Sequence, residues 1–105
     1  MSHSICVLPQ VEQDIDKLCR HMTKTDRDRA MMFFDAVRGT FADLGRMPGM
    51  GRVYDSGEQD LTDLRRWFVK GFKGYLILYR FDNSVVTIVR VLDGRRDISA
   101  IVDEL

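Results

Sequence analysis

The chain has 105 residues, of which 45% are hydrophobic and 30% are charged, and its formal net charge is zero. This length fits one domain, residues 1–105, and the composition is that of a globular protein. The longest apolar runs, such as 75–79, are far too short to span a bilayer, and the N-terminus lacks the basic and apolar segments of a secretory signal. We therefore expect a cytoplasmic protein without a membrane-spanning part.

The two cysteines, Cys6 and Cys19, have no metal-ligand spacing, and we expect both to be buried, reduced thiols. His3 and His21 have no serine or cysteine placed to suggest a catalytic triad, and we interpret them as incidental surface residues. No group of His, Cys and carboxylate residues has ligand spacing. We expect no metal, no cofactor and no small-molecule ligand.

Charge is unevenly distributed along the chain. The segment 64–96 has a net charge of +6, from eight basic and two acidic residues, and the remainder has a net charge of −6. A basic face binds acidic partners, such as an acidic polypeptide segment, a nucleic acid or an acidic protein surface. The alternative is that these cations only solvate one side of a sheet.

The first half of the chain has helical periodicity. Ser4 to Leu8 is a short apolar run ended by Pro9, which predicts a strand. A helix is predicted over about residues 10–23, from the apolar positions Val11, Ile15, Leu18, Cys19 and Met22. Its polar side is expected to hold Glu12, Asp14, Asp16, Lys17 and Arg20. After a polar break at 23–26, a second helix is marked by Ala30, Phe33, Phe34, Val37, Phe41 and Leu44, so that the two helices form a hairpin.

The second half has strand composition. Pro48, Gly49 and Gly51 end the second helix, and a polar loop runs to about Thr62. Strands are predicted over 64–70, 74–81 and 85–92, because these segments are rich in β-branched and aromatic residues and are separated by turn residues. Residues 97–105 predict a short helix or a frayed tail.

These elements predict an α+β fold in the order β-α-α-β-β-β. The helical hairpin packs on one face of a three-stranded antiparallel meander, and the other face is free. We expect the methionines, which cluster at Met31, Met32, Met47 and Met50, to give adaptable core packing. If partly exposed, they would instead form a groove for the amphipathic helix of a partner protein.

Three local motifs resemble those of the RelE/ParE toxin superfamily. Residues 8–15 (LPQVEQDI) look like its strand-to-helix entry, and 44–52 (LGRMPGMGR) look like its exit from the second helix. Most specific are Leu64-Arg65-Arg66, 75–80 (YLILYR) and 88–98 (IVRVLDGRRDI), which resemble the corresponding pattern of ParE-like toxins. The resemblance covers about residues 5–98. Asp93 departs from the pattern, which usually has histidine there.

The resemblance implies a toxin of a bacterial type II toxin–antitoxin pair, held inactive by an antitoxin whose extended, helical tail wraps its surface. RelE-like members cut messenger RNA in the ribosome, whereas ParE-like members poison DNA gyrase. Membership of the superfamily does not choose between these activities.

Cutting RNA through its 2′-hydroxyl requires groups that take and give protons, and arginine is a poor proton shuttle at pH 7. If the chain were a ribonuclease, its catalytic residues would be Arg65, Arg80, Arg95 and Arg96 with Asp93 or Asp97, and Arg90 and Glu104 are further candidates. RelE-like relatives have a tyrosine just past the motif G-[KR]-R, whereas residues 97–102 contain neither tyrosine nor histidine. The ribonuclease interpretation therefore lacks its best proton-transfer group.

We therefore predict a ParE-like toxin that inhibits DNA gyrase by binding and is neutralised by a ParD-like antitoxin. The runner-up is a ribosome-dependent mRNA endonuclease, and a third class is a detoxified scaffold that only binds its antitoxin and regulates their operon. Trp67 follows two arginines and is either a protein-contact anchor or a core residue. The candidates for target binding are Arg65, Arg66, Trp67, Lys70, Lys73, Arg95 and Arg96.

Overall fold

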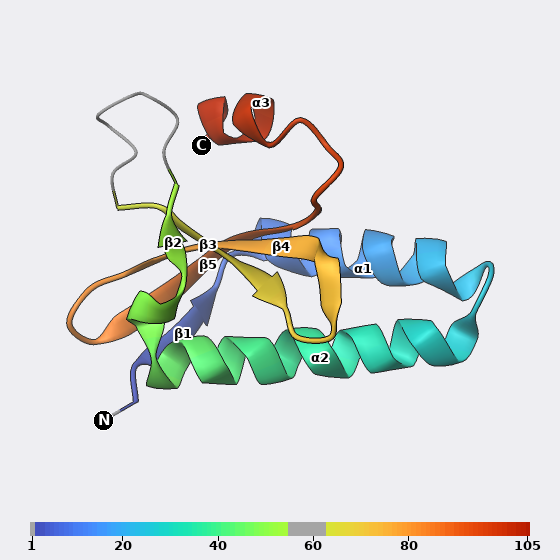
Figure 1. The fold of residues 1–105 in the computed structure, drawn as a ribbon, viewed down its shortest axis with the longest axis horizontal. Coiled ribbons are helices and arrows are strands. Elements are labelled where there is room, and N and C mark those ends of the chain that lie inside the picture. The colour runs from blue at the N-terminus through green and yellow to red at the C-terminus, as the bar shows by residue number, and fades with distance from the viewer. Residues whose placement is uncertain (1, 55–62) are drawn as a thin grey trace.

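The computed structural model describes residues 2–54 and 63–105. Figure 1 shows two long helices side by side along one side of a twisted sheet, with a short helix on the opposite side. Most of the polar loop predicted to end at Thr62 lies outside the described residues. The elements in chain order are β1 (Ser4–Val7), α1 (Pro9–Thr23), α2 (Arg27–Arg46), the 3-10 turn η1 (Pro48–Met50), β2 (Arg52–Val53), β3 (Arg65–Val69), β4 (Phe72–Phe81), β5 (Val85–Asp93) and α3 (Ile98–Asp103).

Local sequence sets the helix boundaries. Pro9 occupies the start of α1, where its missing N–H removes no helical hydrogen bond. The side chain of Asp26 accepts a hydrogen bond of 3.0 Å from the backbone N–H of Arg29 and caps α2. Pro48 follows α2 and begins η1. Within the described residues, no helix is long and apolar enough to cross a membrane.

The strands form one five-stranded sheet in the order β1-β5-β4-β3-β2. The antiparallel meander of β3, β4 and β5 confirms the predicted α+β class. β1 pairs in parallel with β5, with Ser4 opposite Val85, and the chain between these two strands contains the helical hairpin and the strands β2, β3 and β4. The two-residue strand β2 adds an antiparallel edge to β3, with Arg52 opposite Arg66. Sequence periodicity did not predict β2, because two residues are too few to show a pattern.

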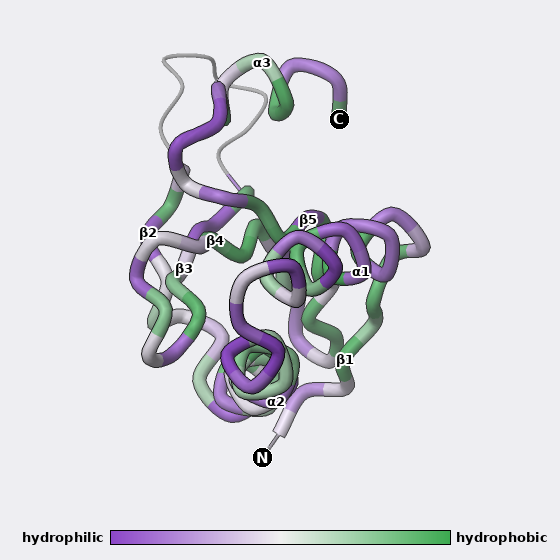
Figure 2. Tube along the Cα trace, turned by 90° about the vertical axis from the view of Figure 1, so that its right-hand side faces the viewer, coloured by the Kyte–Doolittle hydropathy of each residue, from purple (hydrophilic) through white to green (hydrophobic). Residues whose placement is uncertain are grey.

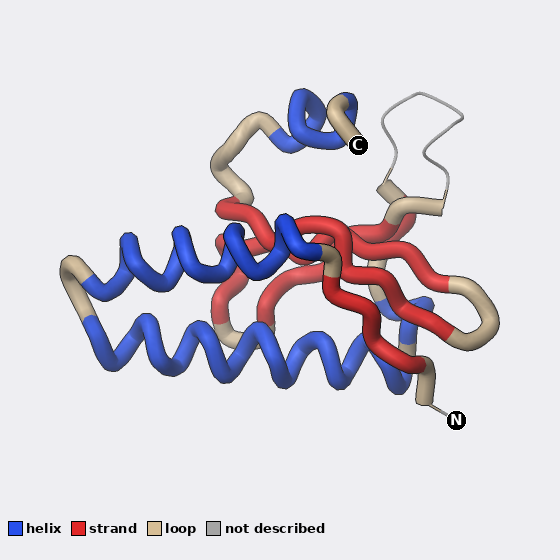
Figure 3. Tube along the Cα trace, turned by 180° about the vertical axis from the view of Figure 1, so that it is seen from behind, coloured by secondary structure: helices blue, strands red, loops and turns tan. Residues whose placement is uncertain are grey.

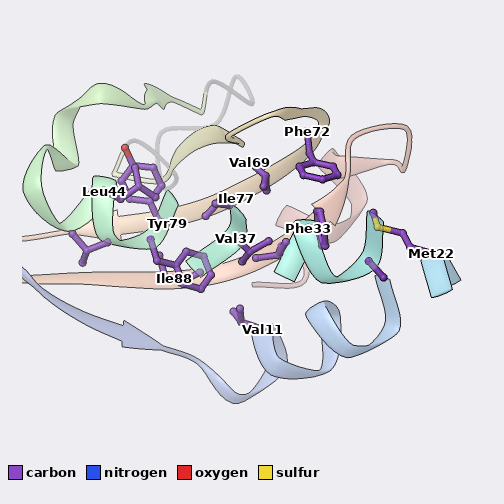
Figure 4. Close-up of a cluster of buried hydrophobic side chains, with 14 residues drawn as sticks. Val11, Met22, Phe33, Val37, Leu44, Val69, Phe72, Ile77, Tyr79 and Ile88 are labelled. Carbon is purple, nitrogen blue, oxygen red and sulfur yellow. The ribbon is translucent and has the colours of Figure 1, made fainter. Parts of the chain in front are cut away.

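The main core lies between the helical hairpin and the sheet. Figure 4 shows Val11, Phe33 and Val37 from the helices pointing toward Ile77 and Ile88 from the strands, and all five side chains are fully buried. The face of the sheet that packs on the helices is therefore apolar, as predicted.

A second core cluster lies on the opposite face of the sheet. Leu64, Leu78, Val89 and Leu92 are buried there under Ile101 and Val102 of α3. The short C-terminal helix is thus ordered, and the face that the sequence left free is partly covered. Figure 3 shows α3 on the side of the sheet opposite α1 and α2.

Several side chains contradict the sequence-based expectations. Cys6 is exposed, since β1 is an edge strand whose four residues all face solvent, and Cys19 is only partly buried. Phe34 is exposed because Phe33 takes the core position at that level of α2, and neighbouring helical residues point about 100° apart. Met31, Met32 and Met47 are also exposed, so the expectation that the methionines pack in the core is wrong for these three, whereas Met22 is buried.

Asp14 is the opposite case. The helical pattern placed it on the polar side of α1, but it is buried against β5. The other four residues expected on that side, Glu12, Asp16, Lys17 and Arg20, are exposed as predicted.

Candidate functional site: a basic sheet face and its neighbours

A pocket of about 380 Å³, here called the sheet-face pocket, opens on the face of the sheet away from α1 and α2. Arg66 and Phe68 of β3 lie opposite Leu78 and Leu76 of β4, and Leu78 belongs to the cluster under α3. Because side chains alternate along a strand, these residues share one face. The pocket is lined by Arg52, Arg66, Trp67, Phe68, Lys73, Gly74, Leu76, Gly94 and Arg95.

Gly94 brings the connection after β5 close to the start of β4. Its N–H donates a 2.7 Å hydrogen bond to the carbonyl of Gly74. A Cβ at position 94 would lie only 3.0 Å from that carbonyl oxygen, so any larger residue here would push the Gly74 backbone away by a few tenths of an ångström. This close approach places Arg95 beside the sheet-face pocket.

Arg95 is held by the carboxylate of Asp93. The guanidinium donates to Asp93 at 3.1 Å and 2.8 Å, and the Arg95 backbone N–H donates to the same carboxylate at 3.0 Å. The Arg95 side chain lowers the pKa of Asp93 below its usual range. Asp93 is therefore an ionised partner of Arg95 and a weak proton acceptor near neutral pH.

Arg65 has a different environment from its neighbour Arg66. Its guanidinium donates a 2.7 Å hydrogen bond to the carbonyl of Gly51 and lies 5.1 Å from the centre of the Phe81 ring. The buried Tyr79 hydroxyl donates to the Pro48 carbonyl at 2.6 Å and accepts from the Gly51 N–H at 2.9 Å, and burial raises the pKa of Tyr79. Arg65 and Tyr79 thus hold the segment 48–51, which links the motifs at 44–52, 64–66 and 75–80.

A groove runs along the outer edge of β3 beside the end of α2, with a volume of about 700 Å³. We call it the edge groove. β2 pairs with β3 only at Arg65 and Arg66, so the groove follows the rest of the strand. Its lining combines apolar side chains with cations, and consists of Asp43, Arg46, Met47, Met50, Trp67, Phe68, Val69, Lys70, Gly71 and Lys73.

The candidates for target binding thus divide among different environments. Arg66, Trp67, Lys73 and Arg95 meet at the sheet-face pocket, and Lys70 lies in the edge groove. Trp67 borders both pockets and is half-buried against the main core, and its role as a protein-contact anchor stays a prediction. Arg65 contacts the 48–51 segment. Arg80 lies 3.4 Å from Asp63 and is not among the lining residues of either pocket.

Arg96 faces a third pocket, of about 440 Å³, between α1 and the end of β5. In this α1–β5 pocket it joins Lys17, Arg20, His21 and Lys24. Sequence analysis missed this cluster, since it treated the α1 cations as a solvated helix side. The available signal was the spacing of residues 17, 20 or 21, and 24, which places them on one side of a helix.

The remaining candidates have local roles. Asp97 accepts a 3.1 Å hydrogen bond from the N–H of Ala100 and caps α3, and Glu104 lies exposed at the end of that helix. His3 lies 2.8 Å from the carbonyl oxygen of Asp82. Among the residues that the structure describes, no group of three or more His, Cys, Asp or Glu side chains could hold a metal ion.

The protein is a small α+β domain with an open, cation-rich sheet face. Residues of the sequence motifs, among them Arg66, Gly94 and Arg95, line this face. The family model described as "ParE toxin of type II toxin-antitoxin system, parDE" matches residues 5–98. The chain therefore belongs to the ParE toxin family and is a toxin of a type II toxin–antitoxin system.

A solved structure has the same fold. A chain from "Chromosomal ParDE TA system from P. aeruginosa" is similar with a TM-score of 0.69 and 13% sequence identity, over 86% of this chain and 94% of that one. At this identity the likeness concerns the fold alone. No curated protein matches the sequence.

Proposed function

We propose that this toxin inhibits DNA gyrase by binding, and that a ParD-like antitoxin neutralises it. The observation that carries the choice of mechanism is the state of the carboxylates beside Gly94-Arg95-Arg96. Asp93 is paired with Arg95 and has a lowered pKa, and Asp97 caps α3. RNA cleavage needs a group that accepts a proton near neutral pH, and these carboxylates have structural partners instead. The surface therefore has cations that can bind a partner, but its neighbouring carboxylates are not free to accept a proton. This combination favours a toxin that acts by binding.

The edge groove supports neutralisation by an antitoxin tail. Phe68 and Met47 are exposed there, and Lys70 and Lys73 flank them. Peptide tails bind such grooves through apolar anchors, with charges at the rim. An acidic, amphipathic antitoxin segment fits this combination.

The test is a supercoiling assay with purified gyrase. We expect the toxin to inhibit supercoiling or to trap cleaved DNA, and addition of the ParD-like antitoxin to restore activity. In cells that express the toxin, we expect DNA damage while translated messages stay intact. A chain that affects neither gyrase nor translation yet binds the antitoxin would instead be a regulatory scaffold.

Three substitutions separate binding from RNA cleavage. Asp93→Asn, Asp97→Asn and Glu104→Gln each remove a carboxylate base, and Asp97→Asn keeps an oxygen that can cap α3. A ribonuclease that used one of them would lose about 100-fold or more in rate. We expect growth inhibition to remain in each variant. Cleavage of messages at ribosomal A-site codons, abolished by one substitution and without any effect on gyrase, would contradict the proposal and favour the endonuclease.

A further inference from the structure

The sheet-face pocket and the α1–β5 pocket meet at the turn that follows β5, since Arg95 lines the first and Arg96 lines the second. Two carboxylates also line the α1–β5 pocket, and each has its own guanidinium partner: Asp14 pairs with Arg90, and Asp93 pairs with Arg95. We call the combined surface the cationic band. Its members come from four elements and two connections that are distant in sequence: Lys17, Arg20, Lys24, Arg52, Arg66, Lys73, Arg95 and Arg96.

The α1 part of the band has charge without apolar anchors. None of the large apolar side chains that are exposed in the described residues lines the α1–β5 pocket. Of its apolar members, Val91 and Leu92 are buried and Leu18 is partly buried against the main core. Amphipathic peptide helices bind through apolar anchors, so this pocket does not suit them. Lysine and arginine without such anchors are the groups that contact nucleic-acid phosphates.

Helix electrostatics explain only part of this cluster. Arg20 and His21 lie in the last turn of α1, where cations stabilise the helix dipole. Lys17 lies before that turn, and Arg96 belongs to another segment, so the dipole does not account for their meeting Lys24 in one pocket. Lys17, Lys24 and Arg96 thus share a position on one surface rather than a role in stabilising α1.

We propose that the cationic band binds the phosphate backbone of duplex DNA. The molecule measures 40 × 33 × 23 Å, so one side of it can follow about one turn of B-form DNA, roughly 34 Å. The choice of DNA rests on the proposed function, because gyrase is an enzyme that holds duplex DNA. The toxin then contacts the DNA on gyrase through this band, which borders the edge groove at Lys73.

The direct test is binding of the full-length toxin to a fluorescently labelled 20-base-pair duplex of arbitrary sequence, measured by fluorescence anisotropy at several salt concentrations. The band variant carries Lys17→Gln, Arg20→Gln and Lys24→Gln. The matched control carries Arg27→Gln, Arg29→Gln and Arg38→Gln, which remove the same charge from exposed positions of α2 that line neither pocket. Far-ultraviolet circular dichroism and urea denaturation confirm that both variants fold.

We expect the control to bind the duplex like the wild type. The band variant should bind about tenfold or more weakly at low salt, and the slope of log affinity against log salt should fall by about one for each phosphate that the variant no longer neutralises. Should the α1 substitutions impair folding, Arg66→Gln with Arg96→Gln tests the same band from a strand and a turn.

Three results would overturn the proposal: no saturable binding of the duplex by the wild type, equal weakening by the band and control variants, or loss of antitoxin binding with DNA binding unchanged in the band variant. The last of these would assign the band to an acidic protein. The supercoiling assay separates this proposal from the proposed function. If the duplex binds through the band but gyrase is not inhibited, only the proposed target is wrong. If gyrase is inhibited and the duplex does not bind, only the DNA contact is wrong.

Discussion

Asp14 is the residue whose environment departs most from its local sequence. Its carboxylate accepts hydrogen bonds from the Arg90 guanidinium at 2.8 Å and 2.9 Å and from the Val91 backbone N–H at 3.0 Å. The hydrogen bonds to Asp14 raise the pKa of Arg90. The Asp14 and Arg90 side chains are only 6% and 15% exposed, so the pair anchors α1 on β5 in a largely water-free setting.

We predict that Asp14→Ala destabilises the fold strongly, because it leaves the Arg90 guanidinium buried without its partner. The expected loss is about 3–5 kcal/mol in the free energy of unfolding, measured by urea denaturation. Asp43→Ala is the matched control, since it breaks the exposed pair with Arg46 and should cost about 0–1 kcal/mol. An equal loss in the free energy of unfolding for the two variants would show that the buried pair stabilises the fold no more than the exposed pair does.

At the scale of elements, α3 depends on its packing. It has six residues, which is too short to be stable alone, and Asp97 supplies its cap. Ile101 and Val102 join the cluster formed by Leu78, Val89 and Leu92. The helix thus covers one part of the outer sheet face, and the sheet-face pocket lies beyond it.

We predict that Ile101→Ala loosens α3 without disturbing the meander. Truncation removes buried apolar packing with a cost of about 2–5 kcal/mol when the helix stays docked. Because α3 is terminal, part of this cost is avoided by local opening. Hydrogen exchange should therefore become faster at the α3 amides and stay slow at those of β4. Leu105→Ala, which truncates an exposed side chain, should leave α3 exchange as in the wild type.

At the scale of the whole molecule, charge is sorted by tertiary structure. Figure 2 shows β4 and β5 as largely hydrophobic segments within the molecule, with hydrophilic segments of α1 and of the connection to α3 around them. The cations of α1 come from the part of the chain with a net negative charge, yet they join Arg96 from the basic segment. The overall charge of zero therefore conceals a positive surface.

Two aspartates with lowered pKa values predict that the folded protein is less stable in acid. Asp82 has a lowered pKa because it accepts backbone hydrogen bonds from Ser84 and Val85, and Asp93 has one because of Arg95. In the unfolded chain the pKa of an aspartate is about 3.9. A lower pKa in the folded protein therefore stabilises the fold at pH values above about 3.9. This contribution is lost as pH falls through the folded pKa values. We predict that the urea midpoint falls below about pH 4.

The double variant Asp82→Asn with Asp93→Asn should show a smaller fall in its urea midpoint over this acid range. Asp103→Asn, at an exposed position of α3, should keep the wild-type pH profile. A double variant with the full wild-type fall would mean that other carboxylates cause the acid sensitivity.

The sequence by itself determined the order of the two long helices and of every strand except β2, the α+β class and the toxin family. These follow from short-range signals: apolar residues at helical spacing before Pro48, strand composition after Leu64, and motifs that each span about eleven residues or fewer. Arg66 and Lys73 could also be selected from the sequence as candidates for target binding, because they belong to the basic segment 64–96. The sequence could not place Asp14 or the α1 cations, since helical periodicity tells which side of a helix is mostly apolar but not what that side meets.

Only the tertiary structure decided these partners. Asp14 and Arg90 are 76 residues apart and meet because β1 runs parallel to β5 and directs α1 along it. The same packing brings Lys17 and Lys24 to Arg96. Contacts of this kind depend on how elements are arranged in the sheet and its layers, and that arrangement minimises the free energy of the whole chain rather than of any segment.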